Sequence, residues 1–356
     1  MKLRILYWNV DNNRQRMNMA LEGKGDWDVV ALQEPYRNNK LSNPAPPCRR
    51  GGRYEMVYHS GRAVLYISKR IERAAWTAEA GEDWAAVTFG GETGEPLTIW
   101  SVYSPNWKRD WQSPLQELAQ REPSGRNVLV GDLNAHHPMW DAYDRTSMTA
   151  TWVLQLAMAW DLDLLTPKGV PTRARQGQRD GTIDHAWATR NSGASYEGAE
   201  DLPGSDHAPQ LVTVPVARDQ IQESRPPRGY SWALLDRARC EVEAAYLTRP
   251  GPITTVEELE GAVETLMQEL TRIADAAAPR KKRNRGACAQ WWDHEVNEAL
   301  KAARKAKREW RASRAESALA HYKQAVQEFD RTARKAQTRG RSSWNGTSVS
   351  HSYRGL

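Results

Sequence analysis

The sequence predicts an α/β (α+β) domain, built as a four-layer, two-sheet β-sandwich flanked by helices and followed by a helical basic tail. Residues 1–216 alternate short runs rich in Val, Ile, Thr, Trp and Tyr with polar or helical stretches, and many strands with interspersed helices are typical of that architecture. From residue 233 onwards the sequence changes to helical segments rich in Ala, Arg, Lys and Glu. A doubly wound sheet is the alternative for the first part.

Apolar runs bounded by polar residues predict the strands of the first part. The expected strands are 3–10, 29–33, 63–67, 85–89, 97–103, 128–131, 182–188 and 210–216. Between some of them we expect helices, at 14–21, 111–120 and 149–160.

A polar stretch around Pro226 and Pro227 predicts a linker at 217–232, between a domain at 1–216 and a helical basic region at 233–341. Helices are expected at 233–247, 255–278 and 290–337, and a disordered end at 342–356. Apolar residues in the last helix recur mostly at intervals of three, four or seven, which predicts one apolar stripe that packs on another helix. The stripe consists of Trp292, Val296, Leu300, Trp310, Leu319, Tyr322, Val326 and Phe329.

Composition and charge exclude several classes of protein. The chain has 356 residues and 40% apolar content, and no apolar run approaches the roughly 18 residues that a membrane span needs. Its three cysteines are widely spaced and form no Cys-x-x-Cys pair, so neither a disulfide framework nor a zinc site is expected. Residues 280–341 hold 18 Lys and Arg against 7 Asp and Glu, so the excess of positive charge lies in the tail. We therefore expect an intracellular protein with no membrane partner.

Six short segments place polar residues where a predicted strand ends or begins. They read Trp-Asn-Val-Asp at 8–11, Leu-Gln-Glu-Pro at 32–35, Val-Tyr-Ser-Pro at 102–105, Gly-Asp-Leu-Asn at 131–134, Ile-Asp-His at 183–185 and Gly-Ser-Asp-His-Ala at 204–208. Each segment alone is explained by turn chemistry. Together they predict a site on one rim of the sheets, because loops at strand ends gather such side chains while the strands fix their positions.

In their order and amino-acid sequence, the segments resemble the endonuclease/exonuclease/phosphatase superfamily. This superfamily includes apurinic endonucleases, type I deoxyribonucleases and the endonuclease domains of non-LTR (LINE-like) retrotransposons. The resemblance covers residues 1–215 and implies a DNase I-like fold. Residues 32–36 and 131–140 look like the retrotransposon branch. The tail that begins near Trp291 is similar to the connector between endonuclease and reverse transcriptase. No Tyr/Phe-x-Asp-Asp polymerase signature is present, so the resemblance implies an endonuclease domain apparently lacking its transcriptase.

The resemblance implies a metal site near Glu34. A hard cation takes carboxylate oxygen, and Mg²⁺ typically binds one or two carboxylates together with substrate phosphate. We therefore expect Mg²⁺, with Mn²⁺ as an alternative, at Glu34, with Asn9 and Asp11 completing its shell and Asp206 as a further metal-side carboxylate. Turn chemistry remains an alternative for Asn9, and a helix N-cap for Asp11.

The remaining motif residues are expected to act on the phosphate. His207 is the imidazole of the site, oriented by Asp184, and acts either as a base or as a cation. Asp132 and Asn134, two apart on an extended segment, would face the same side and hold the attacking water and a phosphate oxygen. Tyr103 would form a hydrogen bond from its phenol to the phosphate. His185 is expected to be structural and Trp140 to belong to the core.

Two groups of residues are candidates for nucleic-acid contacts. Thr172 and Thr182 match positions near the DNA-facing edge of related endonucleases. A compact basic run is typical of a nuclear import signal or of phosphate contacts, with a merely solvated face as the alternative; it consists of Arg280, Lys281, Lys282, Arg283 and Arg285.

The leading functional hypothesis is a Mg²⁺-dependent DNA endonuclease that nicks target DNA for retrotransposition. Its expected partners are DNA and either a reverse transcriptase or element RNA, and its expected location is the nucleus. The alternatives are an apurinic-type repair endonuclease, favoured by the wording of residues 8–11, and a catalytically silent remnant that only binds nucleic acid.

Overall fold

The computed structural model describes residues 2–23, 25–37, 46–47, 52–90, 95–105, 113–200, 202–217, 234–247, 251–278 and 291–345. The predicted linker lies outside these ranges except for residue 217, and the basic run at 280–285 lies wholly outside them. The chain divides into two units, one of residues 1–224 with 286–356 and one of residues 225–285.

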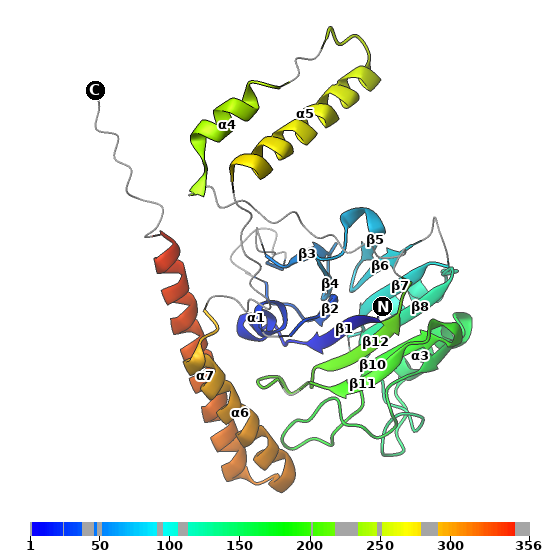
Figure 1. Ribbon diagram of the computed structural model, residues 1–356. Coiled ribbons are helices and arrows are strands. Elements are labelled where there is room, and N and C mark those ends of the chain that lie inside the picture. Colours follow the sequence, from blue (N-terminus) through cyan, green and yellow to red (C-terminus); the bar gives the residue numbers. More distant parts are fainter. Residues whose placement is uncertain are drawn as a thin grey trace. The chain divides into compact units, whose positions relative to one another are not determined.

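The first unit contains two six-stranded mixed sheets (Figure 1). The first sheet has the order β11 (Ser195–Ala199), β12 (Gln210–Pro215), β1 (Lys2–Asn9), β2 (Val29–Gln33), β4 (Ala63–Ser68) and β3 (Tyr54–Val57). The second has the order β5 (Trp76–Gly81), β6 (Trp84–Phe89), β7 (Leu97–Tyr103), β8 (Arg126–Asp132), β10 (Asp184–Thr189) and β9 (Leu162–Leu164). The predicted two-sheet sandwich is confirmed, and the doubly wound alternative is wrong.

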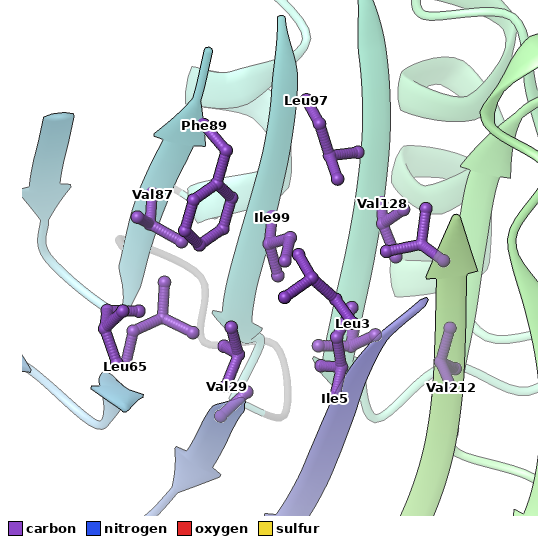
Figure 2. Packing of buried hydrophobic residues seen from close by; sticks show 14 of the residues in the cluster. Leu3, Ile5, Val29, Leu65, Val87, Phe89, Leu97, Ile99, Val128 and Val212 are labelled. Carbon is purple, nitrogen blue, oxygen red and sulfur yellow. The ribbon is translucent and has the colours of Figure 1, made fainter. Parts of the chain in front are cut away.

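The core between the sheets consists mainly of branched aliphatic side chains, with a few aromatic rings such as Phe89 (Figure 2). Ile5 of β1, Val29 of β2 and Ile99 of β7 are each 0% exposed. Such side chains fit the pleated surface of a strand. Each Å² of apolar surface that they remove from water stabilises the fold by roughly 25 cal/mol. This core fixes the two sheets against each other and therefore fixes the ends of their strands.

Helices cover the outer faces of both sheets. On the second sheet, α2 (Pro114–Leu118) and α3 (Met148–Ala159) share a buried cluster with Trp140, which is 0% exposed as predicted for a core residue. On the first sheet, α1 (Arg14–Glu22) begins after Asn13, whose side chain accepts hydrogen bonds from the first turn. Two short 3₁₀ helices occur at Arg73–Ala75 and Arg190–Ser192.

The last part of the chain is a helical hairpin of α6 (His294–Ser313) and α7 (Glu316–Asn345), drawn side by side in orange and red in Figure 1. The single helix predicted at 290–337 is wrong, because the chain turns at Arg314, which has φ +55° and caps α6. The hairpin packs on the outer face of the first sheet through Trp291, Trp292 and Phe329, which join the cluster of Trp8 and α1. α7 continues to Asn345, past the predicted start of a disordered end.

The second unit contains α4 (Arg237–Ala244) and α5 (Val256–Ala277). The two helices are joined by an ion pair of Arg272 with Glu243 and by a hydrogen bond from Asp236 N to Ala277 O of 2.8 Å. The predicted helical region 233–341 is divided between the two units. Its last part belongs to the first unit because apolar residues of its stripe pack against the first sheet. No described helix is long and apolar enough to cross a membrane.

Candidate active site

The strand topology brings the predicted motifs to one edge of the sandwich. β1 is parallel to β2, and β7 is parallel to β8, so the last residues of these strands lie at the same edge. β10 is antiparallel to β8 and begins there, with Asp184 paired to Asp132 in register. β12 is antiparallel to β1 and begins at the same edge, just after His207. Residues far apart in sequence therefore meet.

His207 lies at the centre of this edge and is enclosed by three carboxylates. Its Nδ1 donates to Asp184, with both carboxylate oxygens at 2.9 Å. Its Nε2 lies 3.9 Å from Asp132 Oδ2 and 3.9 Å from Asp206 Oδ1, too far for a direct hydrogen bond. Nε2 has no hydrogen-bond partner among the described residues, so it is available to an oxygen atom placed between the carboxylates.

Burial and the carboxylates determine the charge of His207. Burial alone lowers its pKa, but the nearby Asp184, Asp132 and Asp206 outweigh that effect and raise the pKa to about 9. Burial raises the pKa of Asp132 to about 7, with His207 acting in the opposite direction. At neutral pH the imidazole is therefore a cation, and Asp132 is poised to exchange a proton.

Asn9 connects the two sheets at this edge. Its Nδ2 donates to Asp132 Oδ2 at 2.8 Å, and its backbone oxygen accepts from Ser205 Oγ at 2.9 Å. The side chain is 3% exposed. Asn9 therefore fixes Asp132 and the segment that carries Asp206 and His207, in addition to any role as a metal ligand.

Glu34 follows β2 in a left-handed conformation, with φ +46°. Its Oε1 accepts a hydrogen bond from the phenol of Tyr103. Burial and this hydrogen bond raise the pKa of Tyr103, so the phenol stays neutral and remains a donor. Arg62 covers the Tyr103 ring at 4.5 Å. Tyr103 thus orients the Glu34 carboxylate, whereas the sequence predicted a direct contact with phosphate.

Asp206 is the more exposed of the carboxylates around His207. Its Oδ2 accepts from Arg173 Nε at 3.1 Å, and its side chain is 28% exposed. Burial tends to raise the pKa of Asp206, but His207 and Arg173 lower it. It is therefore a fixed negative charge on the open side of the site.

Several predicted residues do not take the expected places. Asp11 has φ +49°, is 61% exposed and forms an ion pair with Arg16 at 2.9 Å, so its carboxylate is bound to Arg16 at an exposed position. Asn13, and not Asp11, caps α1. Asn134 also has a positive φ, of 48°, and its Nδ2 donates to Ser104 O at 3.0 Å. The predicted extended segment around Asn134 is therefore wrong, because the chain turns sharply after Asp132.

The two candidate threonines are buried. Thr172 is 0% exposed, and its Oγ1 accepts from the backbone amides of Ile183 and Asp184 at 3.0 and 2.9 Å. Thr182 is 2% exposed and donates to Val170 O at 2.8 Å. In this structure both hydroxyls hydrogen-bond to backbone groups between residues 170 and 184, and the phosphate contacts stay a prediction from the sequence.

The donor set of the site fits a divalent cation bound through oxygen. Glu34, Asp206 and Asp132 supply carboxylate oxygens and Asn9 an amide oxygen, which are the ligands that Mg²⁺ and Mn²⁺ prefer. Asp132, Asp184 and His207 also bring one ligand atom each within 4.8 Å of one another. Because Asp184 and the Nδ1 of His207 already bind each other, the more open carboxylates Glu34 and Asp206 are the better candidates.

A basic cavity of about 710 Å³ opens directly beside the site. Asn134 and Arg173 belong to its wall, and both also contact the catalytic edge. Further arginines at 145, 175 and 179 line it. The sequence analysis missed these residues. The only signal for them is the spacing of arginines at 173, 175 and 179, which becomes meaningful once the 172–181 segment is seen to fold back beside Asp206.

His185 is structural, as predicted. It is 0% exposed, and its Nε2 contacts Thr182 O at 2.7 Å. Burial lowers its pKa to about 4, so the ring is neutral at physiological pH. It packs against Trp140 and Trp187 and has no access to a substrate.

Comparison with known proteins gives a family match. The model of the endonuclease/exonuclease/phosphatase family matches residues 6–207, more than half of the chain. The comparison with curated proteins found no match.

Solved structures are similar at low identity. The endonuclease domain of TRAS1, a telomere-specific non-LTR retrotransposon, gives a TM-score of 0.45 at 15% identity, over 60% of this chain and 98% of its own. A 3′-5′ exonuclease from Neisseria meningitidis gives 0.40 at 18%, over 59% and 98%. The inositol polyphosphate 5-phosphatase domain of SPsynaptojanin gives 0.35 at 13%, over 60% and 83%.

Proposed function

This chain belongs to the endonuclease/exonuclease/phosphatase family, and from that premise we propose that it is a divalent-metal-dependent DNA endonuclease that nicks target DNA. The observation that carries the proposal is the buried His207, held by Asp184 and facing Asp132 and Asp206, beside a cavity lined by arginines. The retrotransposon context stays a prediction from the sequence.

The charges of the site assign the proton-transfer roles. His207 is already protonated at neutral pH, so it stabilises negative charge on a phosphoryl oxygen through its Nε2–H. Asp132, with a pKa near the working pH, is suited to take the proton of the attacking water. Asn9 and the Asn134 backbone amide hold its two oxygens, at 2.8 and 3.1 Å.

Glu34 would hold a divalent cation together with Asp206, and such a cation, when bound, would supply Lewis-acid stabilisation of the phosphoryl oxygens. The chain's own contribution there is to orient the carboxylate, through the hydrogen bond from Tyr103. Arg62 stands over the Tyr103 ring and is itself paired with the buried Asp83 at 3.3 Å. Tyr103 is thus held in one orientation.

The arginine-lined cavity favours a nucleic-acid substrate over a small phosphomonoester. One guanidinium group can bind two phosphate oxygens through parallel hydrogen bonds. A nucleic-acid strand presents further phosphates on both sides of the bond that is cut. Arg145, Arg173, Arg175 and Arg179 line this cavity, and Arg173 also contacts Asp206, the neighbour of His207. This arrangement suits the flanking phosphates of a strand whose scissile phosphate lies at His207.

A supercoiled-plasmid nicking assay tests the proposal. The full chain is expected to convert the plasmid to open circles with Mg²⁺ and not with chelator. Glu34→Gln removes a carboxylate charge without changing shape, and should lower the rate on the order of 100-fold. Asp11→Asn is the matched control, since Asp11 is exposed and paired with Arg16; its rate should equal that of the wild type.

Two outcomes would contradict the proposal. No nicking by a folded wild type would remove the nuclease assignment, and equal nicking by wild type and Glu34→Gln would remove the assigned metal site. Cleavage confined to duplexes with an abasic residue would indicate the repair-type endonuclease instead.

A further inference from the structure

The α6–α7 hairpin contacts the segment that carries the last catalytic motif. The phenol oxygen of Tyr322 on α7 accepts a hydrogen bond from Gly204 N at 2.9 Å. Lys307 Nζ on α6 donates to Leu202 O at 2.8 Å. Gly204 and Leu202 immediately precede Asp206 and His207, so the hairpin holds this segment at two points.

The Lys307 contact is specific because the side chain is buried. The residue is 4% exposed, and a buried ammonium is costly unless its donors are bonded. The carbonyl of Leu202 is one acceptor that meets this requirement. A lysine that only increased solubility would keep its side chain in water, whereas the Lys307 side chain is buried.

The hairpin also holds the segment at 172–181. Trp310 and Tyr322 stack with ring centroids 5.6 Å apart and pack on Ala174, which is 3% exposed. Trp310 Nε1 donates to Gln176 Oε1 at 3.3 Å, and Arg314 pairs with Asp180. The break between α6 and α7 thus lies against the segment that lines the basic cavity.

The segments at 202–208 and 172–181, which both contact the hairpin, are hydrogen-bonded to each other beside the site. Ala174 N donates to Asp206 O at 2.8 Å, Ala208 N donates to Thr172 O at 2.6 Å, and Arg173 reaches the Asp206 carboxylate. A shift of either segment would therefore move Asp206 and His207 relative to Asp184 and Asp132, which are fixed on strands.

We infer that the α6–α7 hairpin is a working part of the nuclease unit, in which Tyr322 and Lys307 are positioning residues for the Asp206–His207 segment. This inference rests on the proposed function, because its activity test measures nicking of DNA. It assigns the aromatic stripe of the basic tail to the nuclease itself, whereas the sequence predicted a contact with another helix.

Two substitutions in the full chain test the inference. Tyr322→Phe keeps the ring that stacks on Trp310 and removes the acceptor for Gly204. Lys307→Met keeps the buried chain and removes the donor to Leu202. Because one hydrogen bond is worth a modest free energy, each variant should lower kcat for nicking about threefold to tenfold, with unchanged KM, since the arginine cavity is intact. Tyr246→Phe, in the second unit and 74% exposed, is the control.

Hydrogen–deuterium exchange provides a readout that does not depend on activity. In Tyr322→Phe, peptides over 202–208 should exchange faster than in the wild type, while peptides over α1 should be unchanged. Unchanged exchange at 202–208 in both variants would overturn the inference even if the wild type cut no DNA. Wild-type kcat in both variants of an active enzyme would also overturn it, and would leave the proposed function standing.

Discussion

Replacing Asp184 with Asn tests the charge state assigned to His207. Both carboxylate oxygens of Asp184 lie 2.9 Å from His207 Nδ1, and Asp184 contributes most to raising the pKa of this histidine. Asparagine keeps the size and one acceptor but loses the charge. The histidine should remain in place while its preference for the protonated form weakens.

The size of the effect follows from the pKa. The difference between the ordinary value of 6.5 and about 9 corresponds to about 3 kcal/mol in favour of the charged form. Since Asp132 and Asp206 remain, Asp184→Asn should lower the pKa of His207 by about 1–3 pH units. Because the folded pKa is raised, His207 stabilises the fold below pH 6.5, and this contribution is lost as the pH rises towards 9. The variant should lose part of this pH dependence, because Asp132 and Asp206 still raise the pKa of His207.

The assay is an NMR titration of His207 in the metal-free full chain, combined with nicking rates. Asp184→Asn should move the titration towards neutral pH and lower the nicking rate by about 100-fold or more, as expected for loss of a positioned acid or cation. Asp163→Asn, on β9 and 56% exposed, should change neither value. A His207 pKa that stays near 9 in Asp184→Asn would refute the reasoning.

Three further predictions concern stability. Gly131→Ala should destabilise the fold by about 3 kcal/mol or more in urea denaturation, because Gly131 has φ +154° and a Cβ there would collide with Val102 O; wild-type stability would contradict the strand register. Trp140→Ala should cost about 3–5 kcal/mol, since the ring is fully buried, and a loss below about 1 kcal/mol would place it outside the core. His185, whose folded pKa is about 4, should make the wild type lose up to about 3 kcal/mol as the pH falls from 6.5 to 4. In His185→Phe that slope should be absent, and an unchanged slope would assign it to another group.

The sequence predicted the strands that carry the site because they are central to the sheets. β1, β2, β7 and β8 are mostly buried and each contains a run of apolar residues, so their patterns stand out. The strands that sequence reasoning missed were β3, β5, β9 and β11, and each lies at the edge of a sheet or is short and partly polar. Neighbouring strands specify such segments more than their own residues do.

The position of a candidate site residue is easiest to predict at the end of a strand and hardest where a tight turn follows. Asn9, Asp132 and Asp184 are positioned by their strands. Asp11 and Asn134 lie two residues further on, where positive φ angles redirect the chain. Such reversals at non-glycine residues depend on tertiary contacts and leave little trace in the sequence.

The break between α6 and α7 was equally hidden. Arg314 takes a left-handed conformation that glycine usually provides, so the helical pattern reads as continuous. Its pairing with Asp180 holds the turn against the 172–181 segment. A charge pair between residues so distant in sequence cannot be read from local patterns.

The central claim is that this edge of the two sheets hydrolyses the phosphodiester bonds of DNA. The most direct measurement is single-turnover cleavage of an end-labelled DNA duplex with Mg²⁺ by wild type and His207→Ala, with phosphate release from an inositol polyphosphate measured in parallel. We expect strand cleavage by the wild type, its loss in His207→Ala, and no phosphate release. Phosphate release without DNA cleavage, or equal cleavage by His207→Ala, would contradict it.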